Sequence, residues 1–374
     1  MIDTLGVGII GCGNISSAYM SLGPLFKGIE VRACADINLE AAKERAEEFG
    51  IEALTVEELL DRDDIDIVVN LTIPAAHFEI CSKILEAGKH VYSEKPFVLS
   101  KSEGDALLEK AKASDLRIGS APDTFLGGSH QLVRHLIDSG SVGKILSGTA
   151  VVQSHGAESW HPNPDFFYLP GAGPVLDIGP YYIANLVQLI GPVKEVMAMT
   201  SSGSDTRTIG NGPREGETVP VETPTTIHAI LRFESGAQVT LLTSWDVWSQ
   251  SHSNMELYGE DGSLFIPDPN FFGGDVRFTK QAEEQTLPSW DHPFSINNFE
   301  DNEKANYRGA GLSDMAIAIQ EDRPHRCSAE FAHHVVDVMT SILEAGEKGE
   351  VVNIATSCER PEPLGGAAAK ALMV

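Results

Sequence analysis

The most informative stretch of the chain lies near its start and reads Leu5-Gly6-Val7-Gly8-Ile9-Ile10-Gly11-Cys12-Gly13-Asn14-Ile15-Ser16. An apolar run that ends in a glycine-rich turn is typical of a β-strand leading into a helix. Gly11 permits the tight turn, and Gly13 lets the backbone approach a pyrophosphate held by the positive end of the helix. Ser16, at the third position of the pattern, is small enough for close packing of the helix on the strand. We therefore predict a dinucleotide site whose loop residues are Gly11, Gly13, Asn14 and Ile15.

An acidic residue follows the next apolar run at the spacing that this pattern requires. Residues 30–35 are predicted to form the second strand, and Asp36 ends it, 20 residues after Ser16. A carboxylate there accepts hydrogen bonds from both ribose hydroxyls of a dinucleotide. It would repel a 2′-phosphate, and no arginine follows it to bind one. The predicted cofactor is therefore NAD, in preference to NADP.

Strands and helices alternate through the first third of the chain. Strands are predicted at residues 65–73, 90–93 and 117–120, and helices at 39–49 and 75–87. Asn38 is a good N-cap, and the pairs Thr55/Glu58 and Ser100/Glu103 are capping boxes that open two further helices. This alternation predicts βαβ units and a parallel sheet, so we expect an α/β Rossmann dinucleotide-binding domain over residues 1–123.

Beyond residue 123 the alternation gives way to a run of strands. They are predicted at residues 144–153, 195–201, 226–233, 237–245, 255–258 and 263–266, with hairpin turns at 234–236 and 260–262. Helices are predicted at 126–139 and 329–346, and the Gly-, Thr- and Pro-rich residues 201–224 are expected to loop out. We therefore predict an α+β domain over residues 124–374 with a large, mostly antiparallel open sheet. Its C-terminal tail is expected to pack back on the first domain.

Composition limits the classes of partner. The 374 residues carry 54 acidic and 27 basic side chains, a net charge of −27, so binding to nucleic acid or to an anionic membrane is not expected. No apolar run reaches the ~18 residues that span a bilayer, and no basic region of a signal peptide precedes the first strand. The five cysteines show no metal-binding or redox spacing. We expect reduced thiols, no metal site and a cytoplasmic location.

A second motif, Glu94-Lys95-Pro96, follows the strand predicted at residues 90–93. In a doubly wound sheet this is the carboxyl edge, where ligands bind, although a solvated ion pair before a proline loop is the alternative. Together with the N-terminal dinucleotide pattern, the motif resembles the Gfo/Idh/MocA oxidoreductase family. The resemblance implies that Lys95 lies at the nicotinamide and the reacting oxygen, with Glu94, Thr72, Pro74 and His77 lining the cofactor site. An ammonium beside a carbonyl would stabilise the alkoxide that hydride transfer creates.

The resemblance extends to residues 171–182, where the family carries Asp-x-Gly-x-His and this chain has Asp177 and Tyr181. The two residues are four apart, so one helical turn would present both to one site. Tyrosine in place of histidine resembles the dihydrodiol dehydrogenase and glucose–fructose oxidoreductase branch, which implies that Tyr181 is the general acid/base. A free phenol titrates near pH ~10, so this role requires the charge of Lys95 nearby. Tyr182 is the adjacent competitor, and a tyrosine that only packs the core is the alternative.

An aromatic loop lies upstream and reads Trp160-His161-Pro162-Asn163-Pro164-Asp165-Phe166-Phe167-Tyr168. Aromatic faces stack against the C–H face of a sugar ring, and neighbouring polar groups bind its hydroxyls. We therefore take Trp160, His161 and Asp165, with Lys95, Asp177 and Tyr181, as candidate substrate ligands. The alternative is an irregular loop whose aromatic side chains pack the domain interface.

These motifs predict an NAD(P)-dependent dehydrogenase or reductase that transfers a hydride between nicotinamide and a hydroxyl or carbonyl carbon of a sugar, sugar derivative or cyclitol. Tyr181 would remove the hydroxyl proton, Lys95 would stabilise the alkoxide, and Asp177 would orient the substrate. Two alternatives stay open: an NAD-dependent glycosidase that oxidises its substrate transiently, and a non-catalytic dinucleotide-binding sensor. The family resemblance also implies a homodimer or homotetramer built on the open sheet.

Overall fold

The computed structural model describes residues 3–299 and 302–374, and its first sheet has six parallel strands in the order β3-β2-β1-β4-β5-β6. The strands are β1 (Leu5–Ile10), β2 (Ile29–Ala35), β3 (Glu52–Leu54), β4 (Ile67–Asn70), β5 (His90–Ser93) and β6 (Ile118–Ser120). The helices between them are α1 (Asn14–Leu22), α2 (Leu39–Phe49), α3 (Val56–Leu60), α4 (His77–Glu86) and α5 (Lys101–Ala113). The strand order reverses at β1, which places a ligand-binding crevice between the carboxyl ends of β1 and β4. The predicted Rossmann domain is confirmed.

The second large sheet has nine strands in the order β16-β15-β14-β13-β7-β12-β11-β8-β17. Its members are β7 (Ile145–Gln153), β8 (Val193–Ser201), β11 (Thr226–Phe233), β12 (Gln238–Ser244), β13 (Met255–Gly259), β14 (Gly262–Ile266), β15 (Arg277–Lys280), β16 (Glu283–Glu284) and β17 (Val352–Asn353). Every neighbouring pair is antiparallel except β12 with β7. The predicted open, mostly antiparallel sheet is therefore confirmed, although β15, β16 and β17 were not expected.

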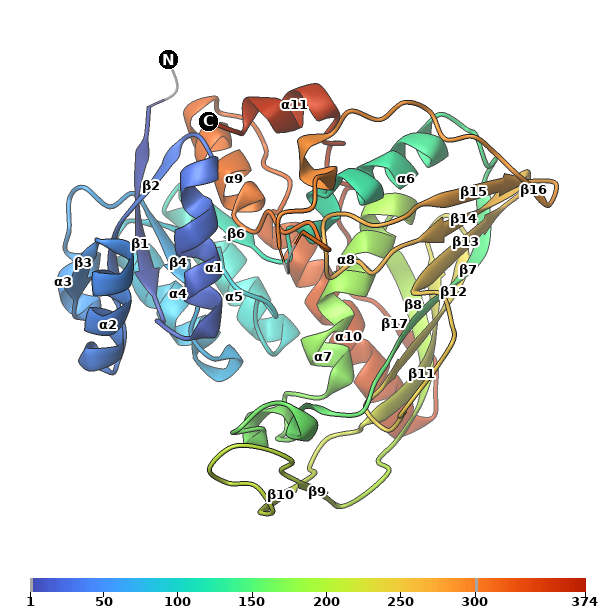
Figure 1. Ribbon diagram of the computed structural model, residues 1–374, viewed down its shortest axis with the longest axis horizontal. Helices are drawn as coiled ribbons and strands as arrows, with labels where there is room; N and C mark the ends of the chain where they lie inside the picture. The colour runs from blue at the N-terminus through green and yellow to red at the C-terminus, as the bar shows by residue number, and fades with distance from the viewer. Residues whose placement is uncertain (1–2, 300–301) are drawn as a thin grey trace.

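Helices fill the space between the two sheets. They are α6 (Gly128–Asp138), α7 (Pro174–Asp177), α8 (Gly179–Ile190), α9 (Ala310–Gln320) and α10 (Ala329–Lys348), and the short α11 (Gly366–Ala371) lies near the C-terminus. Figure 1 shows α8 and α10 between the sheets, and α10 contacts both α5 and β8. Along β11 the residues Ile227, Ala229 and Leu231 are buried beneath these helices, and the side chains that alternate with them are exposed. The core therefore lies between the sheets, and the far face of the nine-stranded sheet is open.

Local signals explain several helix starts. The Asn38 side chain accepts the Glu40 N–H, and both predicted capping boxes are formed, at Thr55 with Glu58 and at Ser100 with Glu103.

No helix in the described part of the chain combines the length and apolarity needed to cross a membrane.

Residues 201–224 leave the nine-stranded sheet, as expected, but the short hairpin that they carry was not predicted. They form a two-stranded sheet, β9 (Thr206–Thr208) with β10 (Thr218–Pro220), which Figure 1 shows beyond α7. The Arg207 guanidinium anchors this hairpin because it pairs with Glu158 at 3.2 Å and with Asp246. A small apolar cluster, formed by Tyr168, Ile209, Val219 and Trp245, seals the contact. Composition could not reveal strands this short, because their stabilising partners lie elsewhere in the chain.

The end of the chain returns to the first sheet. The Lys27 N–H donates to the carbonyl of Leu372 at 2.8 Å, and the Val374 N–H donates to Leu25 at 3.0 Å. Farther back, the Ser120 N–H donates to Cys327 at 2.9 Å, so the segment between α9 and α10 extends beside β6. These contacts hold the C-terminus and the segment around α9 against the Rossmann domain.

Candidate active site

Three loops meet at the carboxyl edge of the first sheet. β1, β4 and β5 are adjacent, and each continues into a segment that carries predicted site residues. Backbone hydrogen bonds between these neighbouring strands continue past the strand ends. The Leu71 N–H donates to the carbonyl of Ile10, and the Glu94 N–H donates to the carbonyl of Asn70. The turn after β1, the segment after β4 and Lys95 therefore lie side by side, as the switch-point rule requires.

The turn after β1 fits a pyrophosphate. Gly11 has φ +102°, and a Cβ there would lie 2.6 Å from the carbonyl carbon of Leu71, so only glycine fits. A Cβ on Gly13 would meet nothing within 4 Å, which leaves the outer side of the turn open. No side chain caps α1 and its first turn holds no acidic residue, so the first N–H groups, at Asn14 and Ile15, remain available to an anion.

Asp36 lies beside this turn, at the end of β2. Its Oδ2 accepts the Cys12 N–H at 2.8 Å, and its Oδ1 accepts the Asn38 N–H at 2.8 Å. A carboxylate has about four acceptor positions, so two remain for ribose hydroxyls. Asp36 therefore shapes the turn as well as presenting the carboxylate that the sequence predicted.

Asp36→Ala is expected to raise the Kd for NAD by about 10- to 100-fold, because charge-assisted hydrogen bonds to the ribose are lost. The Kd for NADP should change less, since its 2′-phosphate no longer meets a carboxylate. Asp36→Asn keeps an acceptor for the Cys12 N–H and separates the role in the turn from the role in binding. Titration calorimetry with both dinucleotides measures this, with exposed Asp63→Ala as the control. An unchanged affinity of Asp36→Ala for NAD would exclude the ribose contact.

The segment after β4 brings Thr72 and Pro74 to the crevice, but His77 lies beneath it. The His77 side chain is completely buried, and its Nδ1 and Nε2 lie 2.7 Å from the carbonyl oxygen of Pro96 and 3.0 Å from that of Thr72, so the neutral ring can donate its one N–H to either. Burial lowers the pKa of His77, against the effect of those carbonyls. The expectation that His77 contacts the cofactor is therefore corrected, because its ring instead ties the Thr72 segment to the Lys95-Pro96 loop.

The central feature of the site is an ion pair between Lys95 and Asp177. The Lys95 Nζ donates to the Asp177 Oδ1 and to its backbone carbonyl, both at 2.8 Å. The helix is interrupted here, because the Tyr181 N–H donates to Ile178 and leaves the Asp177 carbonyl for the lysine. Asp177 and Tyr181 therefore belong to two helices, α7 and α8, rather than to one continuous turn as the spacing suggested. An ammonium has three protons, so one remains for a substrate oxygen.

Lys95 remains a cation at neutral pH. Burial disfavours its ammonium form, but Asp177, Tyr181 and Glu94 outweigh burial and raise the pKa of Lys95 above its ordinary value. Glu94 is itself buried, accepting the Tyr19 hydroxyl at 2.9 Å and the Lys95 N–H at 2.9 Å. The carboxylates of Glu94, in the Rossmann domain, and Asp177, in the second domain, thus keep Lys95 charged.

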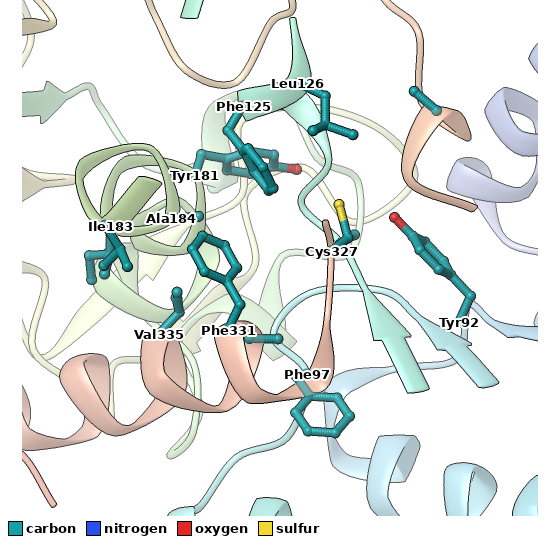
Figure 2. Close-up of a cluster of buried hydrophobic side chains, with 14 of the residues drawn as sticks. Tyr92, Phe97, Phe125, Leu126, Tyr181, Ile183, Ala184, Cys327, Phe331 and Val335 are labelled. Carbon is teal, nitrogen blue, oxygen red and sulfur yellow. The ribbon is translucent and has the colours of Figure 1, made fainter. Parts of the chain in front are cut away.

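Tyr181 lies next to this ion pair. The Lys95 Nζ is 5.3 Å from the centroid of its ring, within cation–π range. Figure 2 shows the ring in a buried cluster near Phe125, with its hydroxyl directed away from Ile183 and Ala184. The ring of Phe125 in turn packs on that of Phe331 at 5.2 Å. The ring is therefore part of the core, with the Lys95 ammonium over it.

The remaining candidate substrate ligands, in the aromatic loop, differ in exposure and in their partners. Trp160 is 61% exposed, and the rings of His161 and Phe167 lie 5.5 and 6.0 Å from it, so Trp160 presents a surface to solvent. Asp165 instead pairs with Arg214 through two hydrogen bonds of 2.6 and 3.1 Å. The carboxylate thus anchors the segment between β9 and β10 to the loop, and its role as a ligand of a substrate hydroxyl stays a prediction.

Two charged residues of the site escaped the sequence reasoning. Arg308, just before α9, donates to the Asn306 Oδ1 at 3.0 Å and to the Asn270 Oδ1 at 2.9 Å. Burial lowers the pKa of Arg308, but Tyr181, Glu94 and Asp123 raise it above its ordinary value. Asp123 is buried below it, and its Oδ2 accepts the N–H groups of Gly309 and Gly311 at 2.9 and 3.0 Å. The only local signal was an arginine next to glycine ahead of an apolar helix. Among the described residues no group of three or more His, Cys, Asp or Glu side chains could hold a metal ion.

Asp123→Asn is expected to stabilise the protein at pH 8. Burial raises the pKa of Asp123 to about 6, against the lowering effects of Gly311, Arg308 and Gly309. The unfolded carboxyl titrates near ~3.9, so the native state loses stability as the pH rises through about 6. Asparagine keeps an acceptor for both N–H groups without a charge, so the free energy of unfolding should rise by about 2 kcal/mol at pH 8.

Urea denaturation of wild type and Asp123→Asn at pH 8 and at pH 4 tests this. The gain should vanish at pH 4, where the native carboxyl of the wild type is protonated. An equal gain at both pH values, or a loss at pH 8, would show that the charge of Asp123 is not the cause.

A broad groove elsewhere in the molecule does not coincide with these residues. It has a volume of about 1710 Å³ and is lined by residues 321–326 and 357–362, among others. Its arginines already have partners: Arg323 and Arg326 pair with Asp314 at 3.1 and 2.5 Å, and Arg360 pairs with Asp138 at 2.8 Å. None of the predicted site residues lines this groove, so size alone does not identify the site.

Comparison with known families agrees with the two-domain arrangement. Residues 5–121 match the sequence profile of an oxidoreductase family with an NAD-binding Rossmann fold, and residues 130–265 match the C-terminal domain profile of the same GFO/IDH/MocA group. The chain belongs to the GFO/IDH/MocA oxidoreductase family. It is therefore an NAD-binding oxidoreductase, and the suspected resemblance is confirmed.

Curated relatives are dehydrogenases and reductases. Levoglucosan dehydrogenase of Pseudarthrobacter phenanthrenivorans is 28% identical over 70% of this chain and 73% of its own length. The dTDP-3,4-didehydro-2,6-dideoxy-α-D-glucose 3-reductase of Saccharopolyspora spinosa is 34% identical over 47% of this chain and 53% of its own. Myo-inositol 2-dehydrogenase of Thermotoga maritima is 23% identical over 69% of this chain and 74% of its own length.

Solved structures share the fold over nearly the whole chain. Levoglucosan dehydrogenase in complex with NADH has a TM-score of 0.81 at 21% identity, covering 95% of this chain and all of that one. An NAD-binding oxidoreductase from Klebsiella pneumoniae has a TM-score of 0.80 at 19% identity, with the same coverage.

Proposed function

We propose that this protein is an NAD-dependent dehydrogenase or reductase that acts on a hydroxyl or carbonyl carbon of a sugar, a sugar derivative or a cyclitol. The observation that carries the proposal is the Lys95–Asp177 ion pair beside Tyr181, at the carboxyl edge of the parallel sheet. A dinucleotide at the turn after β1 would extend along this edge, held by the α1 N–H groups and Asp36. The uncapped start of α1 and the open space beside Gly13 fit such a ligand.

The residues divide the chemistry between them. Bound nicotinamide supplies the hydride acceptor or donor. In the oxidative direction the phenolate form of Tyr181 accepts the hydroxyl proton and becomes the phenol, while Lys95 donates its third N–H to the developing alkoxide. Asp177 fixes the ammonium through two contacts and accepts a neighbouring substrate hydroxyl. In the reductive direction the same groups act in reverse, with Tyr181 returning the proton.

A polyhydroxylated substrate is supported by the relatives and by the loop chemistry. Levoglucosan dehydrogenase, the dTDP-sugar reductase and inositol dehydrogenase are named for a sugar or cyclitol. Exposed Trp160 offers a flat apolar face to the C–H side of a ring, and His161 offers a polar edge beside it.

The test is the appearance of NADH absorbance when the protein is mixed with NAD and a panel of anhydrosugars, aldoses, inositols and glycosides. NADH formation with one class, lost in Lys95→Ala, is expected. Release of free sugar without NADH would replace this proposal by a cofactor-recycling glycosidase. Tight NAD binding with neither product would replace it by a dinucleotide-binding sensor.

We also propose that the open sheet face joins two copies of the chain. Leu146, Met197, Met199 and Ile230 are about half exposed or more on this face, and Met197 lies opposite Ile230 in neighbouring strands. Such a patch is typical of a protein interface. Ile230→Glu is expected to convert a dimer or tetramer into smaller species in light scattering, whereas Ile296→Glu, exposed outside the sheet, should not. A monomeric wild type would contradict this proposal.

A further inference from the structure

A buried hydrogen bond joins the loop that carries Lys95 to helix α1. The Tyr19 hydroxyl, on α1, donates to the Glu94 Oε1 at 2.9 Å, and both residues are buried. The first N–H groups of the same helix belong to the turn that we expect to hold the pyrophosphate. The helix of the dinucleotide turn and the Lys95 loop are therefore connected through one pair of side chains.

The other oxygen of the Glu94 carboxylate holds the backbone of Lys95. Its Oε2 accepts the Lys95 N–H at 2.9 Å, so each carboxylate oxygen has a donor of its own. The Glu94 N–H in turn donates to the carbonyl of Asn70, at the end of β4. Because the carboxylate is bound at both oxygens, it cannot rotate without breaking one of these hydrogen bonds. Glu94 thus transmits the position of the Tyr19 hydroxyl to the Lys95 backbone.

Tyr19 is itself fixed, both at its ring and at its oxygen. The ring packs edge-on against that of Tyr92 in β5, with the centroids 6.4 Å apart and the planes at 64°. Burial, together with the Glu94 carboxylate, raises the pKa of Tyr19 well above its ordinary value. The hydroxyl therefore keeps its proton at neutral pH and remains a donor to Glu94. A phenol held in this way suits a role in fixing Glu94 and not in proton transfer.

The other anchors of the Lys95 loop do not replace Glu94. Pro96, the next residue, has its carbonyl oxygen 2.7 Å from the Nδ1 of His77. The Lys95 Nζ pairs with Asp177 at 2.8 Å, which fixes the ammonium against the second domain. Glu94 fixes the Lys95 backbone against the Rossmann domain, where the nicotinamide is expected to lie. A shift of about 1 Å in a catalytic group can cost about 100-fold in rate, so this second attachment matters for the chemistry.

We propose that Tyr19 is a positioning residue for Lys95, and that it acts through the Glu94 carboxylate. The inference rests on the proposed role of Lys95 in hydride transfer and deepens it. Without the Tyr19 hydroxyl, the carboxylate loses the hydrogen bond at its Oε1 and can turn away from the Lys95 N–H. The ammonium is then placed less precisely beside the nicotinamide, while the cofactor contacts at Gly13 and Asp36 stay as they are.

The first experiment compares kcat for substrate oxidation with the affinity for NAD. Tyr19→Phe keeps the ring and removes the hydroxyl, so kcat should fall about tenfold while the Kd for NAD stays within about twofold. Tyr258→Phe is the matched control, because it removes a tyrosine hydroxyl that donates to a carboxylate, that of Glu256, within β13. Its kcat should equal that of the wild type. A loss of NAD affinity as large as the loss of kcat would show that the hydroxyl supports α1 alone, and would overturn the inference.

A double-mutant cycle tests the route through Glu94. Glu94→Ala removes the acceptor of the Tyr19 hydroxyl, so adding Tyr19→Phe to this variant should change kcat by less than about twofold. A second loss of about tenfold in that background would show that the two residues act independently. That result would overturn the inference.

The last experiment needs neither substrate nor cofactor. Amide hydrogen exchange, followed by NMR, should be about tenfold faster at the Lys95 N–H in Tyr19→Phe than in the wild type, because its acceptor is no longer held. The Leu71 N–H, which donates to the carbonyl of Ile10, is the internal reference and should not change. An unmoved rate at Lys95, or an equal rise at both amides, overturns the inference. Absence of turnover with every substrate contradicts only the proposed function, because the exchange rates still decide whether Tyr19 holds the Lys95 loop.

Discussion

Lys95→Ala is expected to lower kcat by about 10³-fold, while the affinity for NAD stays close to that of the wild type. The variant removes the ammonium that lies beside both Asp177 and Tyr181. In a partly buried site the loss of one donor to a developing alkoxide typically costs a factor of about 10²–10³, and a cation contributes more than a neutral donor. Dinucleotide binding depends mainly on the α1 N–H groups and Asp36, which the substitution does not touch.

The comparison needs a matched lysine and a conservative variant. Lys101→Ala removes an exposed ammonium that pairs with Asp105 on α5, so neither kcat nor NAD affinity should change. Lys95→Arg keeps the charge but has no compact ammonium that can donate to both the Oδ1 and the backbone carbonyl of Asp177. An intermediate kcat is therefore expected. Stopped-flow turnover and calorimetric NAD binding separate the two effects. Full activity in Lys95→Ala would remove the basis of the proposed mechanism.

Features that depend on neighbouring residues were accessible from the sequence. The turn at Gly11 and Gly13, the capping box at Thr55 and the hairpin between β11 and β12 are each specified within a few positions. Their physical causes, a positive φ, a side-chain cap and a glycine turn, act locally. For that reason the order of elements and the carboxyl-edge position of Lys95 could be predicted without any knowledge of the packing.

Features that depend on distant partners were not accessible. Asp165 was predicted to bind substrate because no lysine or arginine lies near it in the sequence. In the fold, Arg214, from the turn between β9 and β10, pairs with its carboxylate. Arg308 carries no motif, and only the fold brings it within electrostatic range of Tyr181, Glu94 and Asp123. The break at Ile178 was hidden for a similar reason, because it is stabilised by Lys95 taking the freed carbonyl of Asp177. Long-range charge pairing, rather than local propensity, decides these three cases.

Tyr181→Phe is expected to lower kcat by a factor of about 10²–10⁴, the usual contribution of a positioned general acid or base. Phenylalanine keeps the ring that packs near Phe125, so the melting temperature should stay close to that of the wild type (Figure 2). The variant loses only the hydroxyl, and with it the proposed proton acceptor next to Lys95. Single-turnover rates report this loss, because they separate the chemical step from product release.

Tyr182→Phe is the matched control, since the two tyrosines are adjacent and both are buried. The Tyr182 hydroxyl accepts from Asn254 at 3.1 Å and donates to Asp268 at 3.3 Å, away from the ion pair of Lys95. Removing it leaves two partly buried side chains without this hydrogen bond, so stability should fall by about 1–3 kcal/mol with kcat preserved. The two variants should therefore show opposite effects. Tyr181→Phe should lower kcat with little change in stability, and Tyr182→Phe should lower stability with little change in kcat. The reverse outcome would transfer the acid/base role to Tyr182.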